Sequence, residues 1–348
     1  MTKIYNLHNA RKWKNDEFYT QYEDVEREME SYIEYDHDVF RDKVILCPCD
    51  NPQKSNFTKY FINNFKRLGI KKLISTCYLG KSEQTSVFDQ NFNGKVFTLC
   101  RDTQKWQLLN LFGNGDFRSE EITRFRDEAD YIITNPPFSL FREFISWIMA
   151  ADKQFSIIGS QNAITYKDIF PLIKENRMWL GNGFRGNVGF FSSEYQDNAK
   201  ASEHKDGLIR VSGVMWFTNI DHGKRHRPIN LMTMDENLKS NKQLINKCRL
   251  ENWLDGGGNP IYPRYTYYDA IEVPFSNAIP SDYSGMMGVP ITFLDRYCPE
   301  QFEIVNGVSR HAYIQTDEMN PRGTYGTDVN GKRMYFRIMI KQKENNDA

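Results

Sequence analysis

Short apolar runs alternate with segments of helical periodicity through the first half of the chain, and this alternation constrains the fold more than any other feature. Runs typical of buried strands lie at residues 44–47, 72–78, 95–100, 131–134 and 155–159. Between them, apolar side chains spaced three and four residues apart, such as Phe61, Phe65 and Leu68, predict amphipathic helices. Strands that alternate with helices are typical of a parallel sheet with helices on both faces. The sequence therefore predicts an α/β fold with a doubly wound, mostly parallel sheet.

Two further helices are predicted by the same periodicity. Residues 15–33 form one amphipathic segment, and residues 140–149 form another directly after the fourth strand. In doubly wound sheets, ligands bind beyond the carboxyl ends of the strands. We therefore expect the chemistry in the turns that follow Cys47 and Thr134.

The composition of the sequence changes after about residue 200. Glycine, proline, asparagine and aromatic residues accumulate over residues 255–287, and strands are predicted at 211–217 and 334–340. We expect a catalytic, cofactor-binding domain over residues 1–200 and a more irregular region over residues 201–348. The last strands of the sheet could come from this second region.

Composition narrows the class of protein. A chain of 348 residues with 40% hydrophobic residues can bury a sizeable core. No apolar stretch approaches the roughly 18 residues that span a bilayer, so we expect a cytoplasmic protein. The six cysteines lack paired Cys-x-x-Cys units, which favours reduced thiols. His222 and His226 lie four residues apart beside basic residues, a pattern more typical of a solvated loop, so no metal site is predicted.

Net charge does not indicate a nucleic-acid-binding protein. Lysine plus arginine and aspartate plus glutamate number 45 each, so any surface for a polyanion has to be local. The two candidates are the run Lys224, Arg225, His226 and Arg227 and the later cluster Arg322, Lys332, Arg333 and Arg337. A solvated surface loop is the alternative explanation for either group.

One stretch carries a specific chemical signal: the strand at 131–134 runs directly into Asn135, Pro136, Pro137 and Phe138. Prolines fix their own backbone and keep the preceding residue out of helical angles, so the Asn135 side chain and the Pro136 carbonyl can be held toward one point. Two acceptors directed at the hydrogens of an aromatic amine favour its nucleophilic, tetrahedral form, and Phe138 can stack on the ring. A stiff turn with no catalytic role is the alternative explanation.

The sequence resembles the amino-methyltransferases that carry an Asn/Asp-Pro-Pro-Tyr/Phe signature and, more closely, the EcoRI-type adenine-specific DNA methyltransferases. The blocks that carry the closer resemblance are NDEFYT at 15–20, CPCDNP at 47–52 with SNF at 55–57, NPPF at 135–138, and GVPITFLD at 288–295 followed by QFEI at 301–304. The resemblance covers nearly the whole chain. It implies a Rossmann-like methyltransferase fold, a C-terminal target-recognition region, and S-adenosyl-L-methionine as the cofactor.

The resemblance also implies cofactor contacts at six positions, namely Phe18, Tyr19, Thr20, Cys49, Asp50 and Asp116. The first three would help to enclose the cofactor, the turn at Cys49 and Asp50 would meet its methionine end, and Asp116 would lie near its adenine. Each position also has a plainer explanation as a core or turn residue.

Two features depart from the pattern of common methyltransferases. The turn after the first strand lacks the glycine-rich sequence that allows close backbone approach to a cofactor. The second strand ends Ser75-Thr76-Cys77-Tyr78, without a carboxylate to hold the ribose hydroxyls. The cofactor assignment therefore depends on the catalytic motif and the family resemblance.

The predicted reaction is methylation of the exocyclic amine of adenine in double-stranded DNA at a specific short sequence. Asn135, Pro136 and Phe138 are the predicted catalytic residues, and Lys224, Arg225 and Arg227 are the predicted DNA contacts. Because the target amine is engaged in base pairing, we expect the adenine to be flipped out of the helix. The chain is expected to act as a monomer, and a companion restriction endonuclease could complete a restriction-modification pair.

Two other functions are compatible with the same sequence. The Asn-Pro-Pro-Phe site could methylate RNA or a protein glutamine, since enzymes of both kinds share this signature. Alternatively, the chain could be a catalytically idle relative that only binds DNA or a partner protein.

Overall fold

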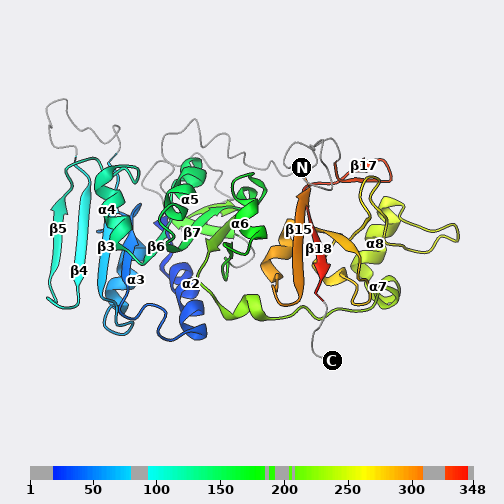
Figure 1. The fold of residues 1–348 in the computed structure, drawn as a ribbon, viewed down its shortest axis with the longest axis horizontal. Coiled ribbons are helices and arrows are strands. Elements are labelled where there is room, and N and C mark those ends of the chain that lie inside the picture. The colour runs from blue at the N-terminus through cyan, green and yellow to red at the C-terminus, as the bar shows by residue number, and fades with distance from the viewer. Residues whose placement is uncertain are drawn as a thin grey trace. The chain divides into compact units, whose positions relative to one another are not determined.

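The computed structural model describes residues 19–79, 93–184, 188–192, 204–205, 208–308 and 326–343. The chain divides into two compact units (Figure 1). The first consists of Met1–Gln161 and Leu180–His222, and the second of Asn162–Trp179 and Gly223–Ala348. None of the described helices has the length and hydropathy needed to cross a membrane.

An eight-stranded mixed sheet forms the centre of the first unit. In spatial order its strands are β5 (Trp106–Asn110), β4 (Lys95–Cys100), β3 (Lys72–Cys77), β2 (Val44–Cys47), β6 (Tyr131–Thr134), β7 (Gln154–Ser160), β12 (Val214–Thr218) and β8 (Trp179–Leu180). Strands β3, β2, β6 and β7 are mutually parallel, as the sequence predicts. Strands β4 and β5 form an antiparallel hairpin against β3, and β12 runs antiparallel to β7. The five residues between Cys100 and Trp106 are too few for a parallel crossover.

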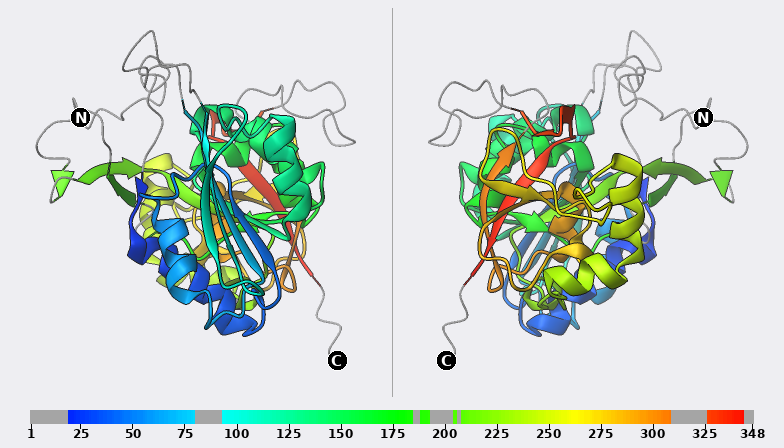
Figure 2. Two further views of the ribbon diagram at one scale, coloured as in Figure 1. Left: turned by 90° about the vertical axis from the view of Figure 1, so that its left-hand side faces the viewer. Right: turned by 90° about the vertical axis from the view of Figure 1, so that its right-hand side faces the viewer.

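Helices cover both faces of this sheet. They are α2 (Tyr22–Tyr35), α3 (Asn56–Asn64), α4 (Glu120–Glu128) and α5 (Phe141–Met149). In Figure 2, α2 and α3, coloured blue, lie on one side of the sheet and the teal α4 on the other. Under α3, Phe57 packs edge-on against Trp216 of β12. On the opposite face, the ring of Phe141 lies against Gly159 so closely that a Cβ there would overlap it. The chain therefore forms a three-layer α/β unit.

Two local predictions are wrong. The first helix was expected from residue 15, but Tyr19–Thr20 form strand β1 and α2 begins at Tyr22. The backbone of β1 pairs with β9 (Val188–Ser192) in a small sheet that continues with β11 (Leu208–Ser212) and β10 (His204–Lys205). The expected strand at 211–217 is two strands in different sheets, because Gly213 adopts a φ of 70° between β11 and β12 and breaks the run.

The second unit contains a four-stranded sheet. Its strands, in spatial order, are β13 (Ala270–Glu272), β14 (Met286–Pro290), β18 (Arg337–Gln342) and β15 (Phe302–Val308). The strand expected at 334–340 is thus β18, displaced toward the C-terminus. The other elements are the helices α6 (Phe170–Lys174), α7 (Met234–Ser240) and α8 (Lys242–Glu251) and a hairpin of β16 (Asp328–Val329) and β17 (Lys332–Arg333).

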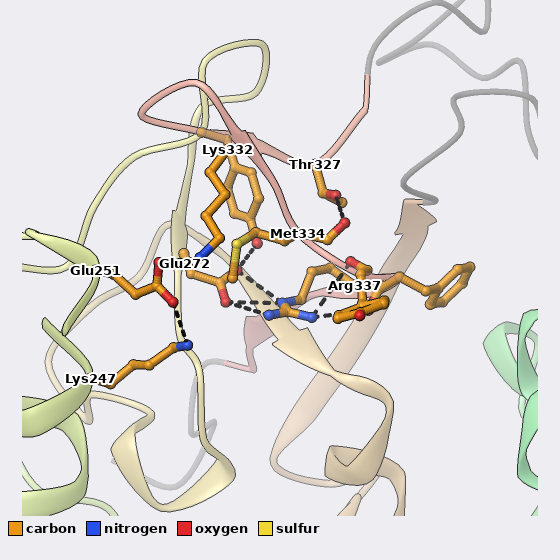
Figure 3. Close-up of polar contacts among 10 residues, drawn as sticks. Lys247, Glu251, Glu272, Thr327, Lys332, Met334 and Arg337 are labelled. Atoms are coloured by element: carbon orange, nitrogen blue, oxygen red, sulfur yellow. Dashed lines mark hydrogen bonds and ion pairs between the residues drawn. The ribbon is translucent and has the colours of Figure 1, made fainter. Parts of the chain in front are cut away.

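A buried ion pair lies within this smaller sheet. Glu272 on β13 is fully buried and accepts hydrogen bonds from the guanidinium of Arg337 on β18, at 2.8 and 3.0 Å (Figure 3). The hydroxyl of Tyr265 donates to the same carboxylate. Gly288 of β14 permits this packing, since a Cβ there would overlap the Tyr265 hydroxyl. The charge of Glu272 is therefore compensated by a guanidinium inside the unit.

Candidate active site

The carboxyl ends of the four parallel strands lie at one edge of the large sheet. The turn after β2 holds Cys49 and Asp50, and the turn after β6 holds Asn135 to Phe138. Because β2 and β6 are neighbours in the sheet, these two turns lie side by side. Two of the sequence blocks are therefore adjacent in the fold.

Asp50 links these turns through its buried carboxylate. Its Oδ1 accepts a hydrogen bond from the Ser55 hydroxyl at 2.6 Å, and its Oδ2 accepts one from the Thr134 hydroxyl at 2.5 Å. Its backbone amide donates to the carbonyl of Thr76 on β3 at 3.0 Å. Ser55 is also the N-cap of α3, where its hydroxyl accepts the amide of Phe57 at 3.1 Å. One side chain thus joins the end of β6 to the start of α3.

The Asp50 carboxyl is buried, and its side-chain partners are hydroxyl groups. Burial raises the pKa of the Asp50 carboxyl to about 6, while the hydrogen bonds from Ser55 and Thr134 act in the opposite direction. Burial also raises the pKa of the neighbouring Cys47 thiol, and the charge of Asp50 adds to that effect. The first strand therefore ends in a carboxyl that titrates close to neutrality and a thiol that stays protonated.

The Asn135-Pro136-Pro137-Phe138 segment follows β6 without an intervening residue. Asn135 is half-buried and Pro136 is buried. Pro137 is extended, with φ −55° and ψ 126°, and its carbonyl accepts the amide of Leu140 at the start of a short 3-10 helix. Phe138 is half-buried and packs against the hydrophobic core beneath α2 and α3. The prolines thus give a stiff exit from the strand, with the amide and the ring at the sheet edge.

Thr20 belongs to the same neighbourhood. The side-chain amide of Asn56, the first residue of α3, donates to the Thr20 carbonyl at 2.7 Å. The Thr20 side chain is buried, and its hydroxyl has no hydrogen-bond partner among the described residues. Phe18 and the side chain of Tyr19 lie outside the described residues. The sequence block at 15–20 is therefore connected to the Asp50 turn through the first turn of α3.

Asp116 lies in a loop that crosses the end of β3. The amide of Leu79 donates to the carbonyl of Asn114 at 2.8 Å, and Gly115 packs so tightly on the Cys77 carbonyl that a Cβ would overlap it. Gly115 also has a φ of 83°, which favours glycine. Gly115 can be seen in the sequence, but glycine is required at this position because the loop packs against β3.

The carboxylate of Asp116 is engaged by Arg118. The guanidinium donates to both carboxylate oxygens, at 2.7 and 2.9 Å, and the Arg118 backbone amide donates at 2.9 Å. These hydrogen bonds hold the pKa of the Asp116 carboxyl below its usual range. Asp116 is thus an ionised group close to the end of β3.

Sequence reasoning did not identify Ser55 or Thr134 as individual site residues. Both are fully buried polar side chains that contact Asp50. The sequence does contain a signal for each residue. A serine before a helix is a typical N-cap, and a threonine at the end of an apolar strand, next to a motif, has a hydroxyl that needs a hydrogen-bond partner. What the sequence could not give is the partner, because Thr134 lies 84 residues from Asp50.

The predicted DNA contacts lie in a short 3-10 helix of the second unit, Gly223–His226, and just after it. Lys224 forms an ion pair with Asp295 at 2.6 Å. Arg225 is buried, lies 3.6 Å over the ring of Trp179 and donates to the Asn176 amide oxygen at 2.5 Å. Arg227 is exposed. Among the three, Arg227 is the side chain most open to an external anion, and the DNA-contact role stays a prediction.

No group of three or more histidine, cysteine, aspartate or glutamate side chains that could hold a metal ion occurs among the described residues. His222 is buried and its Nε2 lies 3.0 Å from the Leu180 carbonyl, while Nδ1 of His226 lies 2.8 Å from Glu300. The two histidines therefore have separate surroundings.

Comparison with known proteins identifies the family. The family model described as "Adenine-specific methyltransferase EcoRI" matches residues 6–343. Type II methyltransferase M.EcoRI of Escherichia coli is 40% identical over 97% of this chain and 96% of that protein. Type II methyltransferase M.MpnI of Mycoplasma pneumoniae is 35% identical over 98% of this chain and 99% of that protein, whereas no solved structure matches. The chain therefore belongs to the EcoRI family of adenine-specific methyltransferases.

Proposed function

We propose that this chain transfers a methyl group from S-adenosylmethionine to the exocyclic amine of adenine in double-stranded DNA, at a specific short sequence. The observation that carries the proposal is the position of Asn135-Pro136-Pro137-Phe138 at the end of β6, fixed by the Thr134–Asp50 hydrogen bond next to the turn after β2. Family membership supports it, because the matching relatives are named Type II methyltransferases.

Two polar groups near this edge, the Thr20 hydroxyl and the Asp116 carboxylate, support the proposed cofactor site. The buried Thr20 hydroxyl has no partner among the described residues, so it can bond to a ligand without losing an internal contact. Asp116 supplies a carboxylate near the end of β3, where ribose and adenine groups would be held. Thr20, Cys49, Asp50 and Asp116 are therefore proposed to surround the cofactor, together with Phe18 and Tyr19.

Bound S-adenosylmethionine would supply the sulfonium methyl group. The Asn135 side-chain oxygen and the Pro136 carbonyl oxygen would accept hydrogen bonds from the adenine amine, which directs the nitrogen lone pair at the methyl carbon. The nitrogen–carbon bond would form as the carbon–sulfur bond of the donor breaks, with the electron pair left on sulfur. The methylated amine then loses one proton to water. Phe138 would stack on the base and hold its plane.

The proposed substrate has to leave the duplex. The adenine amine is paired inside the helix, and a rigid segment at a sheet edge cannot enter a groove far enough to reach it. Extrusion costs a few kcal/mol of unpairing and unstacking, which stacking on Phe138 would partly offset. We propose that the region after residue 200 reads the target sequence, while the residues before it hold the cofactor and the reacting base.

The decisive test is a nucleoside digest after incubation with methyl-labelled S-adenosylmethionine. Double-stranded DNA, RNA and a protein mixture are offered in parallel, and the labelled product is identified by mass spectrometry. The proposal expects N6-methyladenine from the DNA alone. Label in RNA or in glutamine would move the substrate to that polymer, and binding of DNA without transfer of label would indicate an idle relative.

A further inference from the structure

We propose that the β16–β17 hairpin and the tyrosine that follows it, Tyr335, form a DNA-binding surface that contacts the phosphate backbone of the duplex. The inference deepens the proposed function and depends on it, since it assigns part of the DNA contact to a segment separate from the run at 224–227. Its residues are Asp328 to Tyr335.

The hairpin ends in a tight, open tip. Asn330 and Gly331 have φ values of 48° and 77°, the pair of left-handed conformations that a type I′ turn requires. Asn330, Gly331, Lys332 and Arg333 are exposed, and a Cβ on Gly331 would meet nothing within 4 Å. A two-stranded ribbon of this kind is narrow enough to approach a DNA groove.

The base of the hairpin is held firmly in the unit. Val329 is buried and bridges to Tyr265, and the amide of Thr266 donates to the Asp328 carbonyl at 2.9 Å. The hydroxyl of the buried Thr327 donates to the Met334 carbonyl at 2.6 Å (Figure 3). Tyr265 in turn donates to Glu272 of the buried ion pair. The exposed tip is therefore carried on a rigid support and needs little ordering when it binds.

Charges at the hairpin are arranged asymmetrically. Glu251 of α8 pairs with Lys247 and Lys332, and Asp328 pairs with Arg333. The two carboxylates are sheltered, with side chains 10% and 15% exposed, whereas Lys332 and Arg333 are 63% and 55% exposed. Figure 3 shows Lys332 reaching over Glu251 from the hairpin. The outer surface therefore presents cations, and the acids that balance them lie beneath.

These cations are able to change partner. Glu251 keeps Lys247 as a partner when Lys332 turns to a phosphate, and Arg333 lies as far as 3.5 Å from Asp328, so neither cation is held tightly. Tyr335 lies next to them with its side chain 77% exposed, and its hydroxyl can donate to a phosphate oxygen. Two exposed cations on the ribbon, with an exposed tyrosine two residues after Arg333, are the kinds of side chain that contact the phosphate backbone of a duplex.

The test is the salt dependence of DNA binding by the full chain, measured with a labelled duplex that contains the methylated site. Exchange of Lys332→Gln together with Arg333→Gln should reduce the slope of log K against log salt concentration by about 2, roughly one per phosphate contact. The matched control is Lys239→Gln with Arg264→Gln, which removes two exposed, ion-paired cations of the same unit. The control should keep the slope and the methylation rate.

Three further variants separate the effect of the side-chain groups from an effect on folding. Lys332→Arg with Arg333→Lys keeps both charges and should keep the slope, and Tyr335→Phe should weaken binding less than Tyr335→Ala. A wild-type slope in the Gln double variant, or an equal loss in the control, overturns the hairpin surface. If the wild-type chain binds no duplex and methylates none, the proposed function fails, and that result is distinct from a chain that binds duplex with an unchanged slope.

Discussion

Two buried carboxylates, Asp50 in the first unit and Glu272 in the second, meet opposite kinds of partner. Asp50 accepts hydrogen bonds from the hydroxyls of Ser55 and Thr134. Glu272 accepts them from the guanidinium of Arg337 as well as from Tyr265. One carboxylate has polar but neutral partners, and the other has a full counter-charge.

Because of this difference, the protonation of Asp50 can respond to its surroundings, whereas Glu272 has a structural role in the fold. A carboxylate without a counter-charge is expensive to ionise when buried, so small changes in pH or bonding alter its state. A carboxylate with a bonded guanidinium has its counter-charge in place, and removal of either partner leaves a buried charge. Asp50 lies at the candidate active site, whereas Glu272 lies in the sheet that supports the hairpin.

The largest effect is expected at the ion pair. Glu272→Gln leaves the buried Arg337 cation without a counter-charge, and we expect a loss of about 3–5 kcal/mol in the free energy of unfolding. Urea denaturation of the full chain measures it. Asp269→Asn is the matched control, because the exposed Asp269–Arg264 pair should contribute no more than about 1 kcal/mol. Equal, small losses in both variants would show that the Glu272–Arg337 pair does not stabilise the fold more than an exposed pair does.

Asn135→Ala should reduce the rate of methyl transfer by about 10²- to 10³-fold, because it removes an acceptor that acts chiefly as the amine becomes nucleophilic. Unfolding stability should stay near wild type, since Asn135 is only half-buried. Single-turnover transfer to duplex DNA is the measurement. Phe138→Ala should also be severely impaired, and Phe138→Tyr should keep much of the rate. A wild-type rate in Asn135→Ala would remove this residue from the mechanism.

Asp50 should make the free energy of unfolding increase as pH falls, which is the opposite of the usual effect of a carboxylate. Its pKa is raised from 3.8 to about 6 in the folded chain, so the folded state binds the proton more tightly than the unfolded state. The wild type should therefore gain stability over Asp50→Asn as pH falls from about 6 to 4 and lose it as pH rises. The full difference is about 3 kcal/mol. Urea unfolding of both proteins at several pH values tests this, and a constant difference would contradict it.

The smallest effect is expected at Thr134, which acts on Asn135 only through position. Thr134→Val removes the hydroxyl that donates to Asp50, and we expect kcat to fall about tenfold with little change in the KM for the cofactor. Thr134→Ser should restore the rate. Thr58→Val is the control, since Thr58 is equally buried and its hydroxyl lies 2.8 Å from that of Ser75. If both valine variants lose the same activity, the effect is one of stability.

Several elements could be predicted from the sequence because their signal is local. The strands at 44–47 and 131–134 have the bounds expected, and the helix expected at 140–149 begins one residue later, at Phe141. Each is an uninterrupted apolar run or a clear periodicity with turn residues beside it. The strand Tyr19–Thr20 was missed because two residues carry no period, and its pairing with β9 is decided more than 160 residues away.

Side-chain environment could not be predicted in the same way. Arg225 belongs to a basic run that suggests a solvated or DNA-binding loop, yet it is buried over Trp179. Lys332 and Arg333 belong to another such cluster and remain exposed. The residue types are alike, and only the packing around them differs, so a charge pattern alone does not distinguish the two.

By itself, the sequence determined the alternation of strands and helices, the Asn-Pro-Pro-Phe segment at a strand end and the family. These are properties of neighbouring residues, which backbone sterics and hydrophobic periodicity control directly. The tertiary structure alone decided that Thr134 and Ser55 bond to Asp50, that Arg337 neutralises Glu272, and which cations stay exposed. The Thr134–Asp50 and Arg337–Glu272 contacts join residues 84 and 65 positions apart, and the energies of all these contacts come from burial and partner geometry, which exist only once the units are folded.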